Sequence, residues 1–162
     1  MTSESNDLAP LRLAIDASRQ AMEAGDGPYG ATLVNGDGQV LHTARNTRRS
    51  SADCSAHAEM VLVREAESRF GIEALQGSTV YASGEPCAMC SGALFWAGVR
   101  RIVFAVPNRT LGELLGGSLL PMGCAQTLRG ATPAVQVDGP LLEDEGLVVL
   151  REAAARQQRK SV

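Results

Sequence analysis

Hydrophobic and polar residues recur with a helical period along the first part of the chain. The apolar positions over residues 8–24 are three, four or seven residues apart, which places them on one face of a helix. Asp7 stands directly before this stretch and is a suitable capping residue. The pattern therefore predicts an amphipathic first helix. Its apolar face is formed by Leu8, Leu11, Ile15 and Met22.

Shorter apolar runs follow and predict strands. Residues 31–34 and 40–44 flank Asn35-Gly36-Asp37-Gly38, a turn sequence typical of a β-hairpin. Length and apolar spacing indicate the remaining elements. Further strands are expected at 79–82, 101–106 and 135–137, and further helices at 57–70, from Pro86-Cys87 to Gly98, and at 141–158.

This alternation of helices and strands predicts an α/β protein with a central mixed sheet and helices on both faces. We find no linker or internal repeat, so residues 1–162 are expected to form a single domain, with residues 1–7 and 159–162 as flexible ends. Residues 111–133 are rich in glycine and fit no element. Connections of that length are often functional, which makes this segment a candidate cover for a pocket.

Composition narrows the class of protein. With 44% hydrophobic and 20% charged residues, the chain has the make-up of a soluble globular protein. No apolar run is long enough to span a membrane, and residues 1–7 lack the features of a signal peptide. We therefore expect a cytoplasmic location, where cysteines bind metals more often than they form disulfides. The net charge of −3 argues against a protein built mainly to bind nucleic acid.

One group of residues indicates a metal site. His57, Cys87 and Cys90 offer one imidazole and two thiolates, the donors that Zn²⁺ prefers. A closed structural site normally has four protein ligands, whereas three leave a position open for water or substrate. The pattern therefore favours a catalytic zinc. In the alternative interpretation, the cysteines are small buried residues and His57 lies on the surface.

Glu59 is the candidate catalytic residue, because hydrolysis needs a group that moves protons between water and the leaving group. Residues two positions apart in a regular helix point in directions about 200° apart. His57 and Glu59 can therefore converge only at a helix entrance, and Asp53 and Ser55 supply capping residues just before it. Pro86 favours a second helix entrance directly before Cys87.

Two further cysteines leave another alternative open. Cys54 or Cys124 would close the site as a fourth ligand, and the protein would then be a non-catalytic zinc module. The spacing between Cys54 and His57 does not exclude this geometry.

The two motifs together, His57-Ala58-Glu59 and Pro86-Cys87-Ala88-Met89-Cys90, resemble the signature of the cytidine-deaminase-like superfamily of zinc-dependent deaminases. The resemblance is closest to the branch of guanine deaminases and tRNA adenosine deaminases, and it covers most of residues 8–110. It implies a three-layer α/β/α fold with a five-stranded sheet, one Zn²⁺ per chain and a homodimer. It also implies a hydrolase that adds water to a nucleobase and releases ammonia, with Glu59 carrying the protons.

The same resemblance suggests substrate contacts. Asn46 matches an asparagine that contacts the substrate in this branch, and Tyr29 occupies an aromatic position near the base. Trp96 lies in an aromatic-Trp-Ala run similar to that of guanine deaminases, and backbone N–H groups around Glu85 are further candidates. From composition alone, Asn46 is a loop residue that bonds locally, while Tyr29 and Trp96 belong to the core or a dimer interface.

The substrate class is the part of the function that the sequence determines least. The aromatic run before Ala97 and the acidic net charge favour guanine or a related amino-heterocycle, and hence purine metabolism. The tRNA-editing branch ends in a basic, aromatic-rich helix, whereas residues 151–160 are basic but contain no aromatic residue. A tRNA adenosine deaminase and a cytosine, pterin or triazine deaminase remain alternatives.

Overall fold

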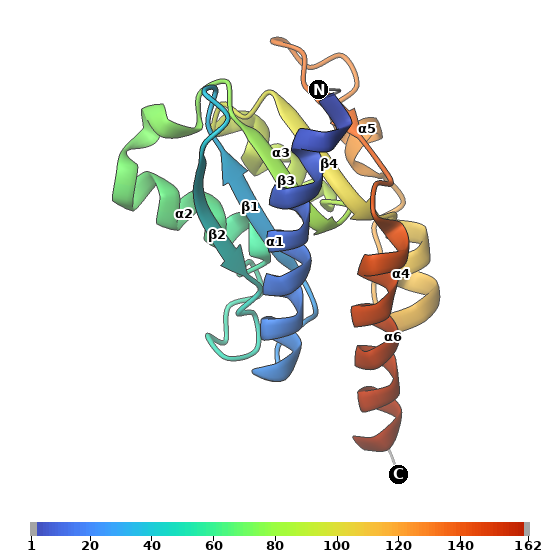
Figure 1. Ribbon diagram of the computed structural model, residues 1–162. Helices are drawn as coiled ribbons and strands as arrows, with labels where there is room; N and C mark the ends of the chain where they lie inside the picture. The colour runs from blue at the N-terminus through green and yellow to red at the C-terminus, as the bar shows by residue number, and fades with distance from the viewer. Residues whose placement is uncertain (1–2, 161–162) are drawn as a thin grey trace.

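A five-stranded mixed sheet forms the centre of the protein, which is described over residues 3–160 by a computed structural model (Figure 1). The strand order is β2-β1-β3-β4-β5. β1 is antiparallel to both of its neighbours, while β3, β4 and β5 are parallel. The strands are β1 (Gly30–Val34), β2 (Val40–Arg45), β3 (Thr79–Gly84), β4 (Arg101–Val106) and β5 (Gln136–Asp138).

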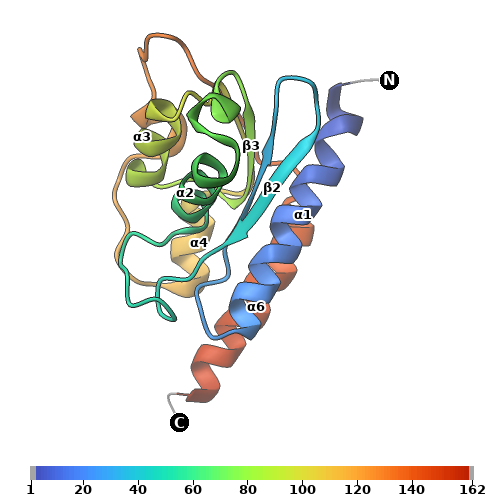
Figure 2. The ribbon, with the colours of Figure 1, turned by 90° about the vertical axis from the view of Figure 1, so that its left-hand side faces the viewer.

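Helices cover both faces of this sheet, which completes three layers (Figure 2). α1 and α6 lie on one face, and α2 and α3 lie on the other. The predicted α/β/α architecture is thereby confirmed. The helices are α1 (Ser3–Glu23), α2 (Ala58–Phe70), a 3-10 turn η1 (Ile72–Leu75), α3 (Ala88–Trp96), α4 (Asn108–Leu115), α5 (Cys124–Thr127) and α6 (Glu143–Lys160).

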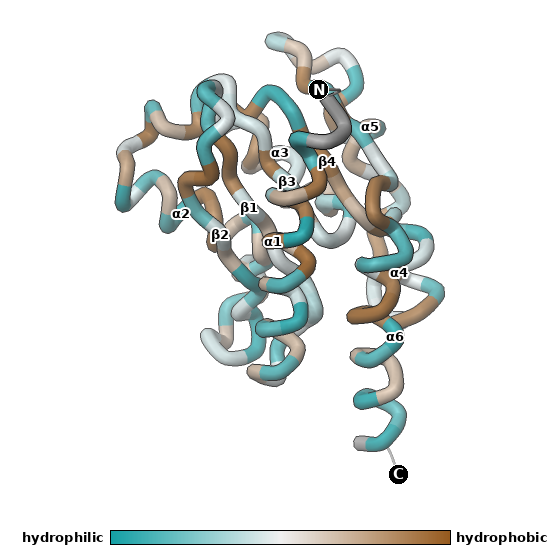
Figure 3. Tube along the Cα trace, in the orientation of Figure 1, coloured by the Kyte–Doolittle hydropathy of each residue, from teal (hydrophilic) through white to brown (hydrophobic). Residues whose placement is uncertain are grey.

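Two hydrophobic clusters, one on each face of the sheet, hold the layers together. Leu62 of α2 and Leu94 of α3 are fully buried in the first cluster, and Leu11 of α1 and Val149 of α6 lie in the second. The hydrophobic parts of the trace accordingly gather on the central strands, while the last turns of α6 are largely hydrophilic (Figure 3). Because both faces of the sheet are covered, β1 is buried along its whole length.

The N-terminal helix is longer than the sequence predicts. It begins at Ser3, so residues 3–7 are helical rather than flexible, while residues 1–2 lie outside the described part. Asp7 lies inside the helix and is not its cap. Its carboxylate accepts two hydrogen bonds from Arg101, both 2.8 Å long, and one of 2.6 Å from the hydroxyl of Tyr81. This buried ion pair ties α1 to β3 and β4, a long-range contact that local patterns do not reveal.

Two helices lie in the glycine-rich segment to which the sequence assigned no element. α4 occupies residues 108–115 and α5 occupies residues 124–127. α6 reaches Lys160, so residues 159 and 160 are also helical, and residues 161–162 lie outside the described part. Among the described residues, no helix has the length and apolar character needed to cross a membrane.

Candidate active site

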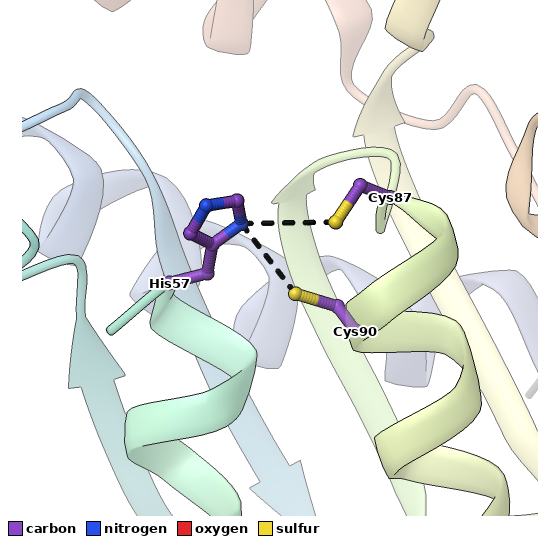
Figure 4. A group of neighbouring side chains, drawn as sticks. All are labelled: His57, Cys87 and Cys90. Carbon is purple, nitrogen blue, oxygen red and sulfur yellow. Dashed lines mark hydrogen bonds between the residues drawn. The ribbon is translucent and has the colours of Figure 1, made fainter. Parts of the chain in front are cut away.

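The proposed metal ligands stand at the entrances of two helices that face each other (Figure 4). His57 is the N-cap residue of α2 and Cys87 is the N-cap residue of α3, both with extended backbones. Neither side chain makes a capping hydrogen bond to its own helix. The imidazole and the thiol point instead toward each other, and Cys90 joins them from the first turn of α3. Pro86 precedes the cap rather than occupying the first turn, which differs slightly from expectation.

The three side chains are spaced as a zinc site requires. Nδ1 of His57 lies 3.7 Å from Sγ of Cys87 and 3.6 Å from Sγ of Cys90. Tetrahedral zinc, with Zn–S and Zn–N bonds of about 2.3 and 2.0 Å, separates a nitrogen from a sulfur ligand by about 3.6 Å. The donor types and their separations therefore both fit one Zn²⁺.

The two other cysteines do not complete a closed site. Cys54 is exposed and Cys124 is buried, and within the described residues the ligand cluster contains only His57, Cys87 and Cys90. Three protein ligands leave one coordination position for water, whose pKa a bound zinc lowers. This arrangement is that of a catalytic rather than a structural zinc site.

The two ligand thiols differ: the hydrogen bond with Cys87 and burial raise the pKa of the Cys90 thiol, whereas the Cys87 thiol lies in an environment that favours the thiolate. Hydrogen bonds from Cys90 and His57 outweigh the effect of burial and lower the pKa of the Cys87 thiol to about 4. Because the thiolate is the form that ligates zinc, Cys87 enters the site already deprotonated at neutral pH.

Glu59 lies beside the ligands in the first turn of α2 and is only 7% exposed. Because His57 is the cap and Glu59 follows two residues later, the irregular helix entrance lets both side chains reach the same pocket, as the sequence predicts. Burial raises the pKa of Glu59 above its ordinary value. A carboxyl group with a raised pKa is suited to accept and return protons near neutral pH.

A pocket of about 600 Å³ opens above these groups. His57, Glu59 and Cys87 line it, together with Tyr29 and Asn46. A further wall is formed by α4 and residues 116–119. The cluster is therefore open to a molecule the size of a nucleobase.

Tyr29 and Asn46 are fixed by contacts with each other and with the loop before α2. The backbone N–H of Asn46 donates to the carbonyl of Tyr29 at 2.9 Å, and the Asn46 side-chain oxygen accepts from the N–H of Arg48 at 3.0 Å. Asn46 is 3% exposed. Burial and the nearby Glu59 raise the pKa of Tyr29 to about 12, so its hydroxyl keeps its proton at neutral pH.

Two other residues that the sequence predicts to contact the substrate, Trp96 and Glu85, have other surroundings in the structure than expected. Trp96 is 83% exposed and is not part of the pocket lining. It follows Cys90 by six residues, a rotation of about 240° around α3, so its side chain points in another direction than that of Cys90. Glu85 lines the pocket, but its backbone N–H donates to the carbonyl of Val106 at 2.8 Å. Its carboxylate accepts hydrogen bonds from two backbone N–H groups, those of Asn108 and Cys124.

The wall formed by α4 is the part of the site that sequence reasoning missed. Leu111 and Leu115 line the pocket from this helix. With Leu114 they form an i, i+3, i+4 pattern of leucines, which is the signal that could have located a short amphipathic helix. The neighbouring glycines obscured it.

A buried carboxyl beside an open His-Cys-Cys cluster is the arrangement of a hydrolytic zinc enzyme. The sequence profile of the cytidine and deoxycytidylate deaminase zinc-binding region matches residues 4–106. The chain belongs to this family. Family membership favours the enzyme over the alternative of a structural zinc module.

Relatives within the family act on different substrates. The chain is 38% identical over 149 residues to a probable cytosine deaminase of Schizosaccharomyces pombe, covering 88% of each protein. It is 34% identical over 104 residues to the guanine deaminase of Bacillus subtilis, covering 64% of this chain and 66% of that protein. A structure from a study of tRNA:A34 deaminases superimposes with a TM-score of 0.71 and 31% identity, covering 86% of this chain and 97% of the other.

Proposed function

We propose that this deaminase acts on a small purine-type base, guanine or a related amino-heterocycle, and releases ammonia. The observation that carries the proposal is the pocket of about 600 Å³ in which Glu59, Tyr29 and Asn46 surround the open side of the ligand cluster. Tyr29 and the leucines of α4 give the pocket an apolar lining for a flat ring, while Asn46 supplies hydrogen-bonding groups for its edge.

The residues of the chain account for the proton movements of such a reaction. Water adds to the ring carbon that bears the amino group, and Glu59 takes one proton from it and delivers that proton to the adjacent ring nitrogen. Glu59 then moves the second proton to the amino group, which leaves as ammonia while the carbon becomes a carbonyl. A buried carboxyl with a raised pKa serves both transfers.

The similarity to the guanine deaminase of Bacillus subtilis supports a purine substrate. The similarity to a probable cytosine deaminase keeps a pyrimidine base as an alternative, because the pocket volume admits the smaller ring as well. The cytoplasmic location expected from the sequence stays a prediction.

A substrate panel tests the proposal. The zinc-loaded protein is assayed for ammonia release with guanine, adenine, cytosine, their nucleosides and a tRNA anticodon stem-loop. We expect release from guanine or a related free base, and less from the corresponding nucleoside. Glu59→Ala serves as the inactive control. Activity on cytosine alone would contradict the purine assignment, and silence on every free base would contradict the proposed substrate class.

A second candidate is the deamination of adenosine in tRNA, which one further feature favours. A groove of about 870 Å³ between the ends of α1 and α6 shares Gly27, Pro28, Arg49 and Gln157 with the catalytic pocket. Arg49, Arg156 and Arg159 line this groove and outnumber its two acidic residues, Glu23 and Asp26. Arginine side chains next to a base-sized pocket suit the phosphates of a nucleic acid. Activity on the stem-loop that falls steeply between about 50 and 200 mM salt would support this candidate.

We also propose that the enzyme is a homodimer that associates through α3. Trp96 is 83% exposed and Met89 is 39% exposed on this helix, and large apolar side chains in such positions are typical of interfaces. In sedimentation equilibrium at micromolar concentration we expect twice the mass of one chain, and a Trp96→Ser variant that dissociates at least about tenfold more readily. A monomeric wild-type protein would contradict the proposal.

A further inference from the structure

One wall of the catalytic pocket is supplied by a single segment, residues 107–124, which joins β4 to α5. Within it, α4 and residues 116–119 face the pocket. Its first half, α4, packs through Leu111, Leu114 and Leu115 on the second hydrophobic cluster, whereas the stretch after α4 reaches the zinc ligands again only at Cys124. What holds the two stems of the segment decides where the wall stands relative to the substrate.

Glu85 holds both stems with one carboxylate. Oε2 accepts a hydrogen bond of 2.9 Å from the backbone N–H of Asn108, and Oε1 accepts one of 2.7 Å from the backbone N–H of Cys124. Asn108 is the first residue of α4 and Cys124 the first of α5. A carboxylate is well suited to this position, because the first N–H groups of a helix have no partner within the helix.

Two glycines allow the close approach. A Cβ atom at Gly123 would lie 2.5 Å from Oε1 of Glu85, so any larger residue would displace the carboxylate. A Cβ atom at Gly84 would lie 2.9 Å from Cδ1 of Leu111, so this glycine lets α4 rest on the end of β3. The wall is therefore in close contact with Glu85 through Gly123, and with the end of β3 at Gly84.

Between α4 and the second stem, residues 116–122 are exposed and weakly packed. Leu119, Leu120 and Met122 are 52%, 61% and 43% exposed. Gly116 and Gly117 adopt φ values of 66° and 92°, which non-glycine residues rarely adopt. A segment with few packing contacts depends on its anchored ends for a defined position.

We propose that Glu85 is a positioning residue that fixes this wall against the pocket and so sets how tightly the substrate ring is held. Glu85 lies two residues before Cys87, so the same turn that presents a zinc ligand also places the wall. The role of the wall in substrate binding rests on the proposed function, but it does not depend on which base is the substrate.

Glu85→Gln tests the proposal. An amide has one acceptor oxygen, so one of the two N–H groups loses its partner and meets an NH₂ group instead. We expect KM for guanine to rise about tenfold or more, with kcat reduced less than about threefold and zinc content unchanged. Cleavage by chymotrypsin after Leu119 or Met122 should accelerate by a similar factor. Gly123→Ala, which displaces the same carboxylate, should reproduce both effects.

Glu113→Gln is the matched control. Glu113 lies on the outer side of α4 and forms an exposed ion pair with Arg109. Its replacement by glutamine changes the charge in the same way as Glu85→Gln, but KM and the cleavage rate should stay at wild-type values. Wild-type KM and cleavage rate in Glu85→Gln would overturn the proposal, as would loss of zinc together with kcat. Because the cleavage assay needs no substrate, it still tests the anchoring of the wall if guanine proves not to be the substrate.

Discussion

Replacement of Glu59 by glutamine is expected to lower kcat/KM by a factor of about 10²–10⁴ while leaving zinc bound. Glutamine keeps the shape of the side chain but cannot accept and return a proton. Glu59 is not a member of the ligand cluster, so the metal site should survive the change. The expected loss is therefore in kcat rather than in KM. Steady-state kinetics and zinc analysis of the same preparation measure both quantities.

Glu67→Gln provides the control for this prediction. Glu67 lies on the same helix, α2, but outside the pocket lining, so the substitution changes charge without touching the site. Wild-type turnover in Glu59→Gln would show that another group carries the protons. Loss of zinc in this variant would instead indicate that Glu59 supports the ligands.

Replacement of Cys90 by alanine is expected to abolish zinc binding and activity together. Cys90 is fully buried and supplies one of only three protein donors, so the remaining pair binds zinc weakly. We expect less than about one tenth of the wild-type zinc content and no measurable turnover. The melting temperature should fall by roughly 5–10 °C, because a ligand at a hundred times its Kd stabilises a fold by about 2.7 kcal/mol.

A strong chelator should lower the melting temperature of the wild-type protein by a similar amount. Cys54→Ala is the control variant. It should change neither zinc content nor stability, since Cys54 is exposed and lies outside the cluster. Full zinc content in Cys90→Ala would contradict the assigned ligand set. An unchanged melting curve in excess chelator, with zinc shown to be absent, would contradict the coupling of metal binding to folding.

The convergence of His57, Cys87, Cys90 and Glu59 could be predicted from the sequence because their geometry is local. Two residues at a helix entrance, and two cysteines one turn apart, have their relative directions fixed by the helix itself. The hairpin, β4 and the helix after His57 could be located for the same reason, since period and turn residues specify them.

Contacts between residues that are far apart in the sequence could not be predicted in this way. Asp7 has the sequence context of a cap, and only the sheet brings it to Arg101. Glu85 gives no local sign that its carboxylate reaches Cys124, which lies 39 residues further along the chain. The exposure of Trp96 likewise depends on which face of α3 turns toward the core.

The entrances of α2 and α3 hold the reactive groups, while the wall that faces them belongs to a different segment, whose two stems are both held by Glu85. The proposed catalytic groups and this wall are thus carried by separate stretches of the chain. Residues between the two stems can change in length and character without disturbing the ligands, as long as the acidic residue before Pro86 and the glycine before Cys124 are kept. A new substrate range is within reach by grafting another segment between those two points.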